Sequence, residues 1–196
     1  MTLRGVDWAV VLGGSAIGAA ILAGCVVFAE DGPPLPQVRL ALISLVAAAA
    51  FVLDEPAAAT VDAMPNTRRR RTAARTTAVA LPLAVWVLGV LALELRTAVT
   101  PAGGLLVEGA GVLAVAVAAA AVLRLVGRAD PGEAVATVLG AGMLGVIIFN
   151  PPPRSVPIFP IDHGWAASTT LWVGLTAAAV ILVLFASRDP YRPGRM

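Results

Sequence analysis

The chain has 196 residues, of which 59% are hydrophobic and only 13% are charged. Soluble domains average about 25% charged residues, so this composition excludes a soluble or secreted globular domain. The formal net charge of +2 comes with fourteen basic residues, all arginine, which lie between apolar stretches without interleaved aromatic residues, and we expect no nucleic-acid binding. The composition predicts an all-α integral membrane protein of about six transmembrane helices, with the lipid bilayer as its surroundings and with residue usage typical of a GC-rich bacterium.

Six apolar segments follow one another along a single transmembrane domain, residues 1–196. They cover residues 8–29, 38–53, 77–95, 103–126, 134–149 and 165–186. Their lengths are close to the roughly 20 residues that a helix needs to cross a bilayer. The first segment is longer than the apolar part of a typical signal peptide, so we expect it to be a retained helix.

The distribution of arginines predicts the orientation of these helices. If both termini are cytoplasmic, eleven arginines lie in the inner segments and three lie outside, namely Arg39, Arg96 and Arg154. This asymmetry is what the positive-inside rule requires. The sequence therefore predicts a multi-pass plasma-membrane protein with a cytoplasmic tail, residues 187–196, and an extracellular proline-rich segment, residues 150–164.

The cytoplasmic segment between the second and third spans, residues 54–76, has the pattern of a short helix. Asp54, Glu55 and Pro56 are typical of a helix start, and Pro65 is expected to end the helix. The arginines that follow would anchor the start of the third span at the inner interface: Arg68, Arg69, Arg70, Arg71 and Arg75. Such a helix could transmit force from a soluble partner; the alternative is a basic loop that only fixes topology.

This segment resembles the coupling region of bacterial ABC-2-type permeases, which have six spans with both ends inside. The shared features are an acidic start, small residues, a Pro after a hydrophobic residue and then basic residues, although Ala59 replaces the glycine usual in that family and the spacing from Asp62 to Pro65 is shorter. The resemblance implies a permease subunit of an exporter that pairs with a second permease subunit, identical or related. It also implies that a separately encoded ABC ATP-binding subunit docks on Asp54, Glu55, Thr60, Asp62 and Pro65.

Two other places carry polar residues of interest. Glu108 lies inside the fourth span, where an ionised carboxylate is costly; it could line a cavity or pathway, pair with an arginine, or be neutral. Asp162, His163 and Trp165 belong to a possible re-entrant element before the sixth span. The alternatives there are a surface loop for Asp162 and His163 and an interface anchor for Trp165.

The sequence offers no catalytic, cofactor-binding or metal site. It lacks a glycine-rich phosphate loop followed by lysine and a His/Cys/carboxylate cluster with metal-ligand spacing, so ATP would bind the partner subunit and the chain itself is not expected to be an enzyme. Two alternatives to a permease remain. One is a non-transporting scaffold or accessory subunit of another membrane complex, and the other is a membrane-embedded enzyme that uses Glu108, Asp162 or His163.

Overall fold

The computed structural model describes residues 6–29, 34–54, 68–97, 101–128, 130–149, 158–161 and 164–188, and only the backbone of residues 68–71. Within these ranges six helices are long and apolar enough to cross a membrane, and no strand occurs in them. The predicted all-α architecture with six candidate spans is therefore confirmed. The helices are α1 (Trp8–Val27), α2 (Leu35–Ala50), α5 (Ala80–Thr97), α6 (Ala102–Leu125), α7 (Gly132–Phe149) and α8 (Trp165–Ala186).

Three short helical segments extend two of these spans. The 3₁₀ turn η1 (Phe51–Leu53) continues α2, whereas α4 (Arg68–Thr76) and η2 (Thr77–Val79) run directly into α5. The third candidate span therefore begins at Thr72, before the predicted start at residue 77. The second begins at Leu35 rather than at residue 38, because Pro36 stands in the first turn, where its missing N–H leaves no intrahelical bond unmade.

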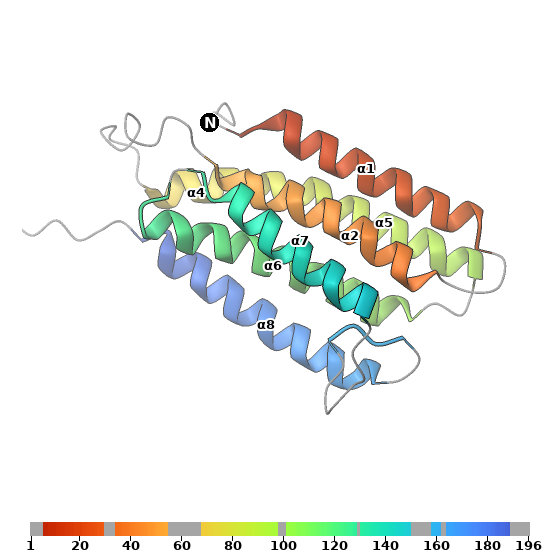
Figure 1. Ribbon diagram of the computed structural model, residues 1–196. Coiled ribbons are helices and arrows are strands. Elements are labelled where there is room, and N and C mark those ends of the chain that lie inside the picture. The colour runs from red at the N-terminus through yellow and green to blue at the C-terminus, as the bar shows by residue number, and fades with distance from the viewer. Residues whose placement is uncertain are drawn as a thin grey trace, which may run out of the picture.

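Successive long helices run antiparallel to one another, as Figure 1 shows. One end of the bundle gathers α4, the starts of α1, α5 and α7, and the ends of α2, α6 and α8. We call it the arginine-rich end, because it holds α4 together with Arg75, Arg124, Arg128 and Arg188. The opposite end contains residues 158–161 and is called the Pro160 end.

Two helices form the centre of the bundle. Helix α2 contacts α1, α5, α6 and α7, and α6 contacts α2, α5 and α8 and, over a smaller area, α7. Both have 61% of their apolar window buried, against 17% for α7 and α8. The core between them is filled mainly by aliphatic side chains and by the fully buried Trp86, whose indole N–H donates to the Leu105 carbonyl at 3.0 Å.

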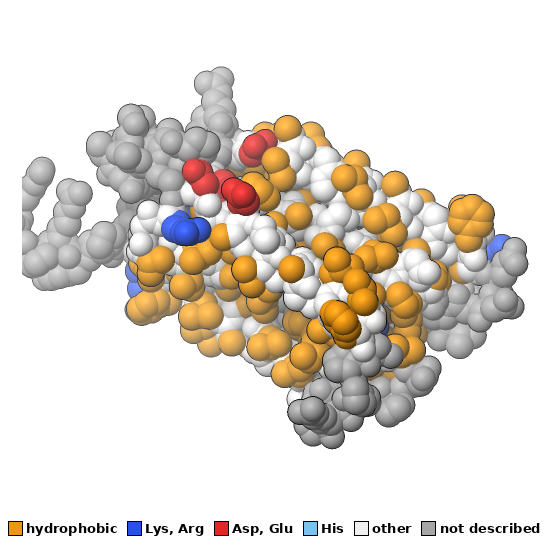
Figure 2. Space-filling model, viewed as in Figure 1, with side chains coloured by type: hydrophobic (Ala, Val, Ile, Leu, Met, Phe, Trp, Pro, Cys, Tyr) orange, Lys and Arg blue, Asp and Glu red, His pale blue; other side chains and the backbone are white. Residues whose placement is uncertain are grey.

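The outer surface of the bundle is apolar between its two ends. Large aliphatic side chains point outward along several helices, including Ile17 of α1, Leu88 of α5, Val138 of α7 and Ile181 of α8. In the view of Figure 2, red and blue side chains lie only near the ends, and the middle is orange and white. An apolar band of this kind matches a hydrocarbon environment, as expected for six membrane-spanning helices.

Candidate functional site

A buried ion pair joins α2 to α6 near the Pro160 end. Arg39, in the second turn of α2, donates from Nε to Oε1 of Glu108 at 2.9 Å and from Nη2 to Oε2 at 3.1 Å. The Glu108 side chain is fully buried and that of Arg39 is 4% exposed. Because the planar guanidinium meets both carboxylate oxygens, the pair has the two-pronged geometry that arginine favours.

Both charges lie inside the candidate spans. At a rise of about 1.5 Å per residue, Arg39 lies about 6 Å along α2 from its first residue, and Glu108 about 9 Å along α6. A single charge at that depth is costly, and pairing two opposite charges with full hydrogen bonding compensates much of the cost. Glu108 is therefore paired with an arginine, one of the three roles considered for it. Arg39, which was counted among the external arginines, is buried in the bundle instead.

Residues 158–161 cover this ion pair. Arg39 Nη2 also donates to the Pro160 carbonyl at 2.6 Å, so the guanidinium joins the segment as well as α6. The Arg39 guanidinium carbon lies 5.2 Å from the centre of the Phe159 ring, within the range of a cation–π contact. The Phe159 ring stacks in turn on Trp172 of α8, with 5.9 Å between the ring centres.

The same segment is tied to α8 through one carbonyl. The Ile158 carbonyl accepts hydrogen bonds from Ser168 Oγ at 3.1 Å and from Trp172 Nε1 at 3.0 Å. Together with the Arg39 contacts, these bonds hold residues 158–161 against both α2 and α8. The Pro160 end thus contains a connected cluster to which α2 contributes Arg39, α6 contributes Glu108, and α8 contributes Ser168 and Trp172.

At the opposite end, Asp54 links three elements. Its Oδ1 accepts a hydrogen bond from the backbone N–H of Gly132, the first residue of α7, at 2.7 Å. At a helix N-terminus a carboxylate interacts favourably with the helix dipole. Arg75 of α4 donates from Nη1 to the Asp54 backbone carbonyl at 3.0 Å. Position 132 needs glycine, because a Cβ there would lie 2.7 Å from Asp54 Oδ2. We call this meeting point of α2, α4 and α7 the Asp54 junction.

The Asp54 carboxyl is poorly solvated at this junction, with the residue only 6% exposed. Desolvation raises its pKa to about 6, although the hydrogen bond from Gly132 acts in the opposite direction. The group therefore titrates close to neutral pH, which is unusual for an aspartate. Protonation of this carboxyl group therefore affects its hydrogen bond with Gly132 at the start of α7.

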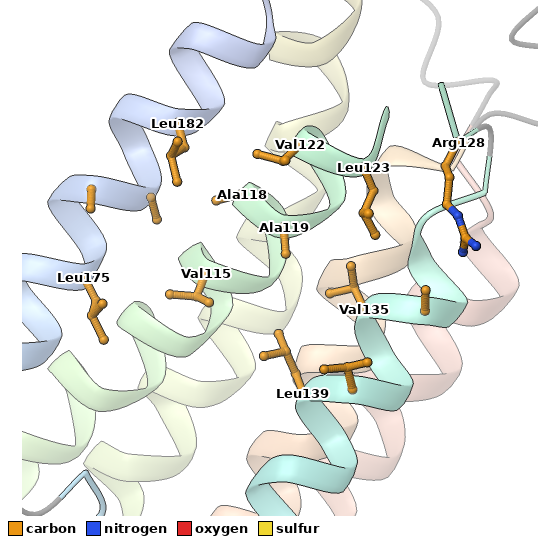
Figure 3. A pocket seen from close by; sticks show the side chains of 14 residues that line it. Val115, Ala118, Ala119, Val122, Leu123, Arg128, Val135, Leu139, Leu175 and Leu182 are labelled. Atoms are coloured by element: carbon orange, nitrogen blue, oxygen red, sulfur yellow. The ribbon is translucent and has the colours of Figure 1, made fainter. Parts of the chain in front are cut away.

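An apolar groove of about 600 Å³ lies between α6, α7 and α8 in the half of the bundle nearer the arginine-rich end. It exists because α6 packs closely along α8, whereas α7 packs along α2 and meets α6 over a much smaller area. Figure 3 shows side chains of all three helices around this space, with Arg128 at its end beside the start of α7. Its other lining residues are Val115, Ala118, Ala119, Val122, Leu123, Ala134, Val135, Val138, Leu139, Leu175, Ala178, Ala179 and Leu182.

The described residues include only some of those predicted to carry function. Asp54 turns its carboxylate to α7 rather than outward, and Arg75 is buried beside it. Trp165 is the first residue of α8 and packs on α6 at Gly104. Arg68, Arg69, Arg70 and Arg71 form the start of α4. Outside the described residues lie the rest of the expected coupling helix and re-entrant element: Glu55, Thr60, Asp62, Pro65, Asp162 and His163.

Sequence reasoning considered an arginine partner for Glu108 but did not identify Arg39, and it did not predict the groove. A signal for the pair existed, because Arg39 is the one charged residue in the apolar run 38–53, as Glu108 is among residues 103–123. Two opposite charges that lie within apolar helices are expected to pair with each other. Comparison of the chain with protein-family models, with curated proteins and with solved structures finds no match.

Proposed function

We propose that this protein is the membrane-spanning permease subunit of an ABC-2-like transporter, an exporter driven by a separately encoded ATPase. The observation that carries the proposal is the Asp54 junction. Asp54 directly precedes residues 55–67, and α4 directly follows them. Because Asp54 bonds to both Gly132 and Arg75, a partner that displaces residues 55–67 would act on α2, α4 and α7 together.

The arginine-rich end would face the cytoplasm. Its described part carries eight arginines, Arg68 to Arg71, Arg75, Arg124, Arg128 and Arg188, against four acidic residues, Asp7, Asp54, Asp130 and Glu133. The positive-inside rule counts basic residues rather than net charge, and these eight arginines compare with two, Arg39 and Arg96, in the described part of the opposite end. Both termini and residues 54–76 would then be within reach of a soluble ATPase.

The packing of α7 suggests how movement at the junction would open a path. Helix α7 has few buried residues and a small contact with α6, so its displacement breaks fewer contacts than that of α2 or α6. Alternating access needs two arrangements whose balance the nucleotide state of the ATPase shifts. A shift of α7 away from α6 would widen the apolar groove, which fits a hydrophobic or amphipathic cargo, and a second permease subunit would complete the path.

Co-purification with candidate ATPases from the same cell tests the docking step. The double variant Glu55→Ala/Asp62→Ala is expected to lose the ATPase that the wild type captures. The matched control is Glu94→Ala, which removes an exposed carboxylate in α5 near the opposite end and is expected to capture the ATPase as before. Failure of the wild type to capture an ATPase, or equal capture by the double variant, would overturn the docking proposal.

A second measurement tests the coupling step. Spin labels on α5 and α7 in the captured complex are expected to report a distance change when ATP is added. The variant Asp54→Ala, which removes the bond to Gly132, is expected to retain the ATPase but to lose that change. If the wild-type complex shows no nucleotide-dependent change and no stimulation of ATP hydrolysis, the chain is a scaffold or accessory subunit instead.

A further inference from the structure

The groove between α6, α7 and α8 has the form of a binding site for a molecule with an apolar chain and one charged group. Its volume of about 600 Å³ lies within the range of small-molecule pockets. Arg128 is the one charged residue in its lining, and the other lining side chains are Ala, Val and Leu. In a bilayer, this combination matches the acyl chain and headgroup of a lipid better than it matches a soluble ligand.

The end of α6 fixes Arg128 at the mouth of the groove. Gly127 adopts a positive φ of 95°, which a residue with a side chain rarely tolerates. The Arg128 N–H then bonds to the Leu123 carbonyl at 3.0 Å, and the Gly127 N–H bonds to the Arg124 carbonyl at 3.1 Å. These two bonds form a Schellman motif, so the position of the Arg128 backbone is set by the helix end.

The Arg128 guanidinium has no acidic partner among the described residues. Its side chain is exposed, and within the described part of the chain no carboxylate lies within 4.0 Å of it. A guanidinium binds a phosphate with two parallel hydrogen bonds. Basic pockets between transmembrane helices at the cytoplasmic face bind anionic headgroups.

We propose that this groove binds an anionic phospholipid, with one acyl chain between α6, α7 and α8 and the headgroup phosphate on Arg128. The excess of arginine at this end of the bundle favours a headgroup with net negative charge. Two acidic residues also lie at this end, Asp130 just before α7 and Glu133 in its first turn. Their carboxylates would attract the ammonium of a zwitterionic headgroup. The comparison with phosphatidylethanolamine is therefore the decisive test of the headgroup preference. The site does not depend on the proposed transport function.

Native mass spectrometry of the delipidated protein in detergent tests the headgroup contact. Phosphatidylglycerol is expected to bind in preference to phosphatidylethanolamine and phosphatidylcholine with the same acyl chains. Arg128→Ala and Arg128→Gln are expected to weaken phosphatidylglycerol binding about fivefold. Arg188→Ala is the matched control, since Arg188 is exposed at the same end but does not line the groove. Equal binding of the three lipids, or undiminished binding by both Arg128 variants, would overturn the proposal.

A second pair of variants tests the acyl-chain contact. Ala119→Phe places a ring in the groove and is expected to reduce phosphatidylglycerol binding, whereas Ala177→Phe adds the same volume on an exposed face of α8 outside the lining and is expected to leave it unchanged. If Ala119→Phe binds phosphatidylglycerol as well as the wild type does, the groove is not the site. The same conclusion follows if the wild type forms a dimer that Ala119→Phe dissociates and Ala177→Phe does not. No ATPase is present in this assay, so its result is separate from that of the co-purification.

Discussion

The Nε atom of Arg39 lies 2.9 Å from Oε1 of Glu108, although 69 positions separate the two residues in the chain. This contact connects the two most buried helices and, through the Pro160 carbonyl, the segment that covers them. Neither charge has an equivalent partner elsewhere in the described residues. The energetics of the Pro160 end therefore depend on both residues being present.

We expect single substitutions of the ion pair to be much worse than the double substitution. Arg39→Leu or Glu108→Leu leaves one buried charge uncompensated, which costs about 3–5 kcal/mol in a protein interior. Arg39→Leu/Glu108→Leu removes both charges and is expected to cost much less than the sum of the two. Thermal unfolding in detergent or nanodiscs gives the double-mutant cycle. Additive losses would show that the two side chains do not stabilise each other.

Substitution of Trp172 tests how residues 158–161 are held. Trp172→Phe keeps an aromatic ring beside Phe159 but removes the Nε1 donor to the Ile158 carbonyl, and we expect a loss of about 1 kcal/mol. Hydrogen exchange at residues 158–161 is expected to speed up. Trp165→Phe is the matched control, because the Trp165 indole makes no hydrogen bond to residues 158–161. Unchanged exchange in Trp172→Phe would contradict the assignment.

The Asp54 carboxyl predicts a pH dependence at the arginine-rich end. Burial raises its pKa from 3.8 to about 6, so the folded state binds this proton more tightly than the unfolded state. The contribution to stability is therefore largest below pH 4 and is lost as the pH rises through about 6. Thermal unfolding of the wild type and of Asp54→Asn, compared at pH 5 and pH 7.5, measures it.

The variant Asp54→Asn keeps an oxygen that can accept from Gly132 but cannot titrate. We expect it to remove the part of the pH dependence that comes from the junction, while other groups titrate as before. A wild-type curve and an Asp54→Asn curve of the same shape between pH 5 and 7.5 would contradict the perturbed pKa.

Gly132→Ala is expected to disrupt the Asp54 junction. The added Cβ would lie 2.7 Å from Asp54 Oδ2 and 2.9 Å from the Phe51 Cα, and relief of such crowding costs about 1–3 kcal/mol. Gly142→Ala, in the same helix but facing open space, is expected to be neutral or stabilising by about 1 kcal/mol. Unfolding temperatures of the two variants give the comparison, and equal values would argue against close packing at position 132.

Much of the helical architecture could be predicted from hydropathy, because each span must satisfy its backbone hydrogen bonds within itself. The starts of α2 and α5 were harder to predict. The proline at position 36 is compatible with a first turn, and the arginines of α4 allowed a loop as an alternative although arginine is a good helix former.

The sites were harder to predict because they depend on which helices become neighbours. Asp54 was interpreted as a local helix start, yet its carboxylate caps α7, whose first residue follows 78 positions later. The groove has no sequence signature at all, since alanine, valine and leucine line it as they line the core. Only the choice of α2 as the neighbour of α7 leaves that space next to α6.

The separation of Arg39 from Glu108 has a consequence for biogenesis. When α2 leaves the ribosome and enters the bilayer, the chain that contains Glu108 has not yet been synthesised. An arginine within an apolar helix disfavours insertion by about 2.5 kcal/mol at mid-depth and less toward the ends, so we expect α2 to sit displaced toward the headgroups at first. Its final depth would be reached only once α6 arrives, which makes the insertion of this early helix dependent on a later one.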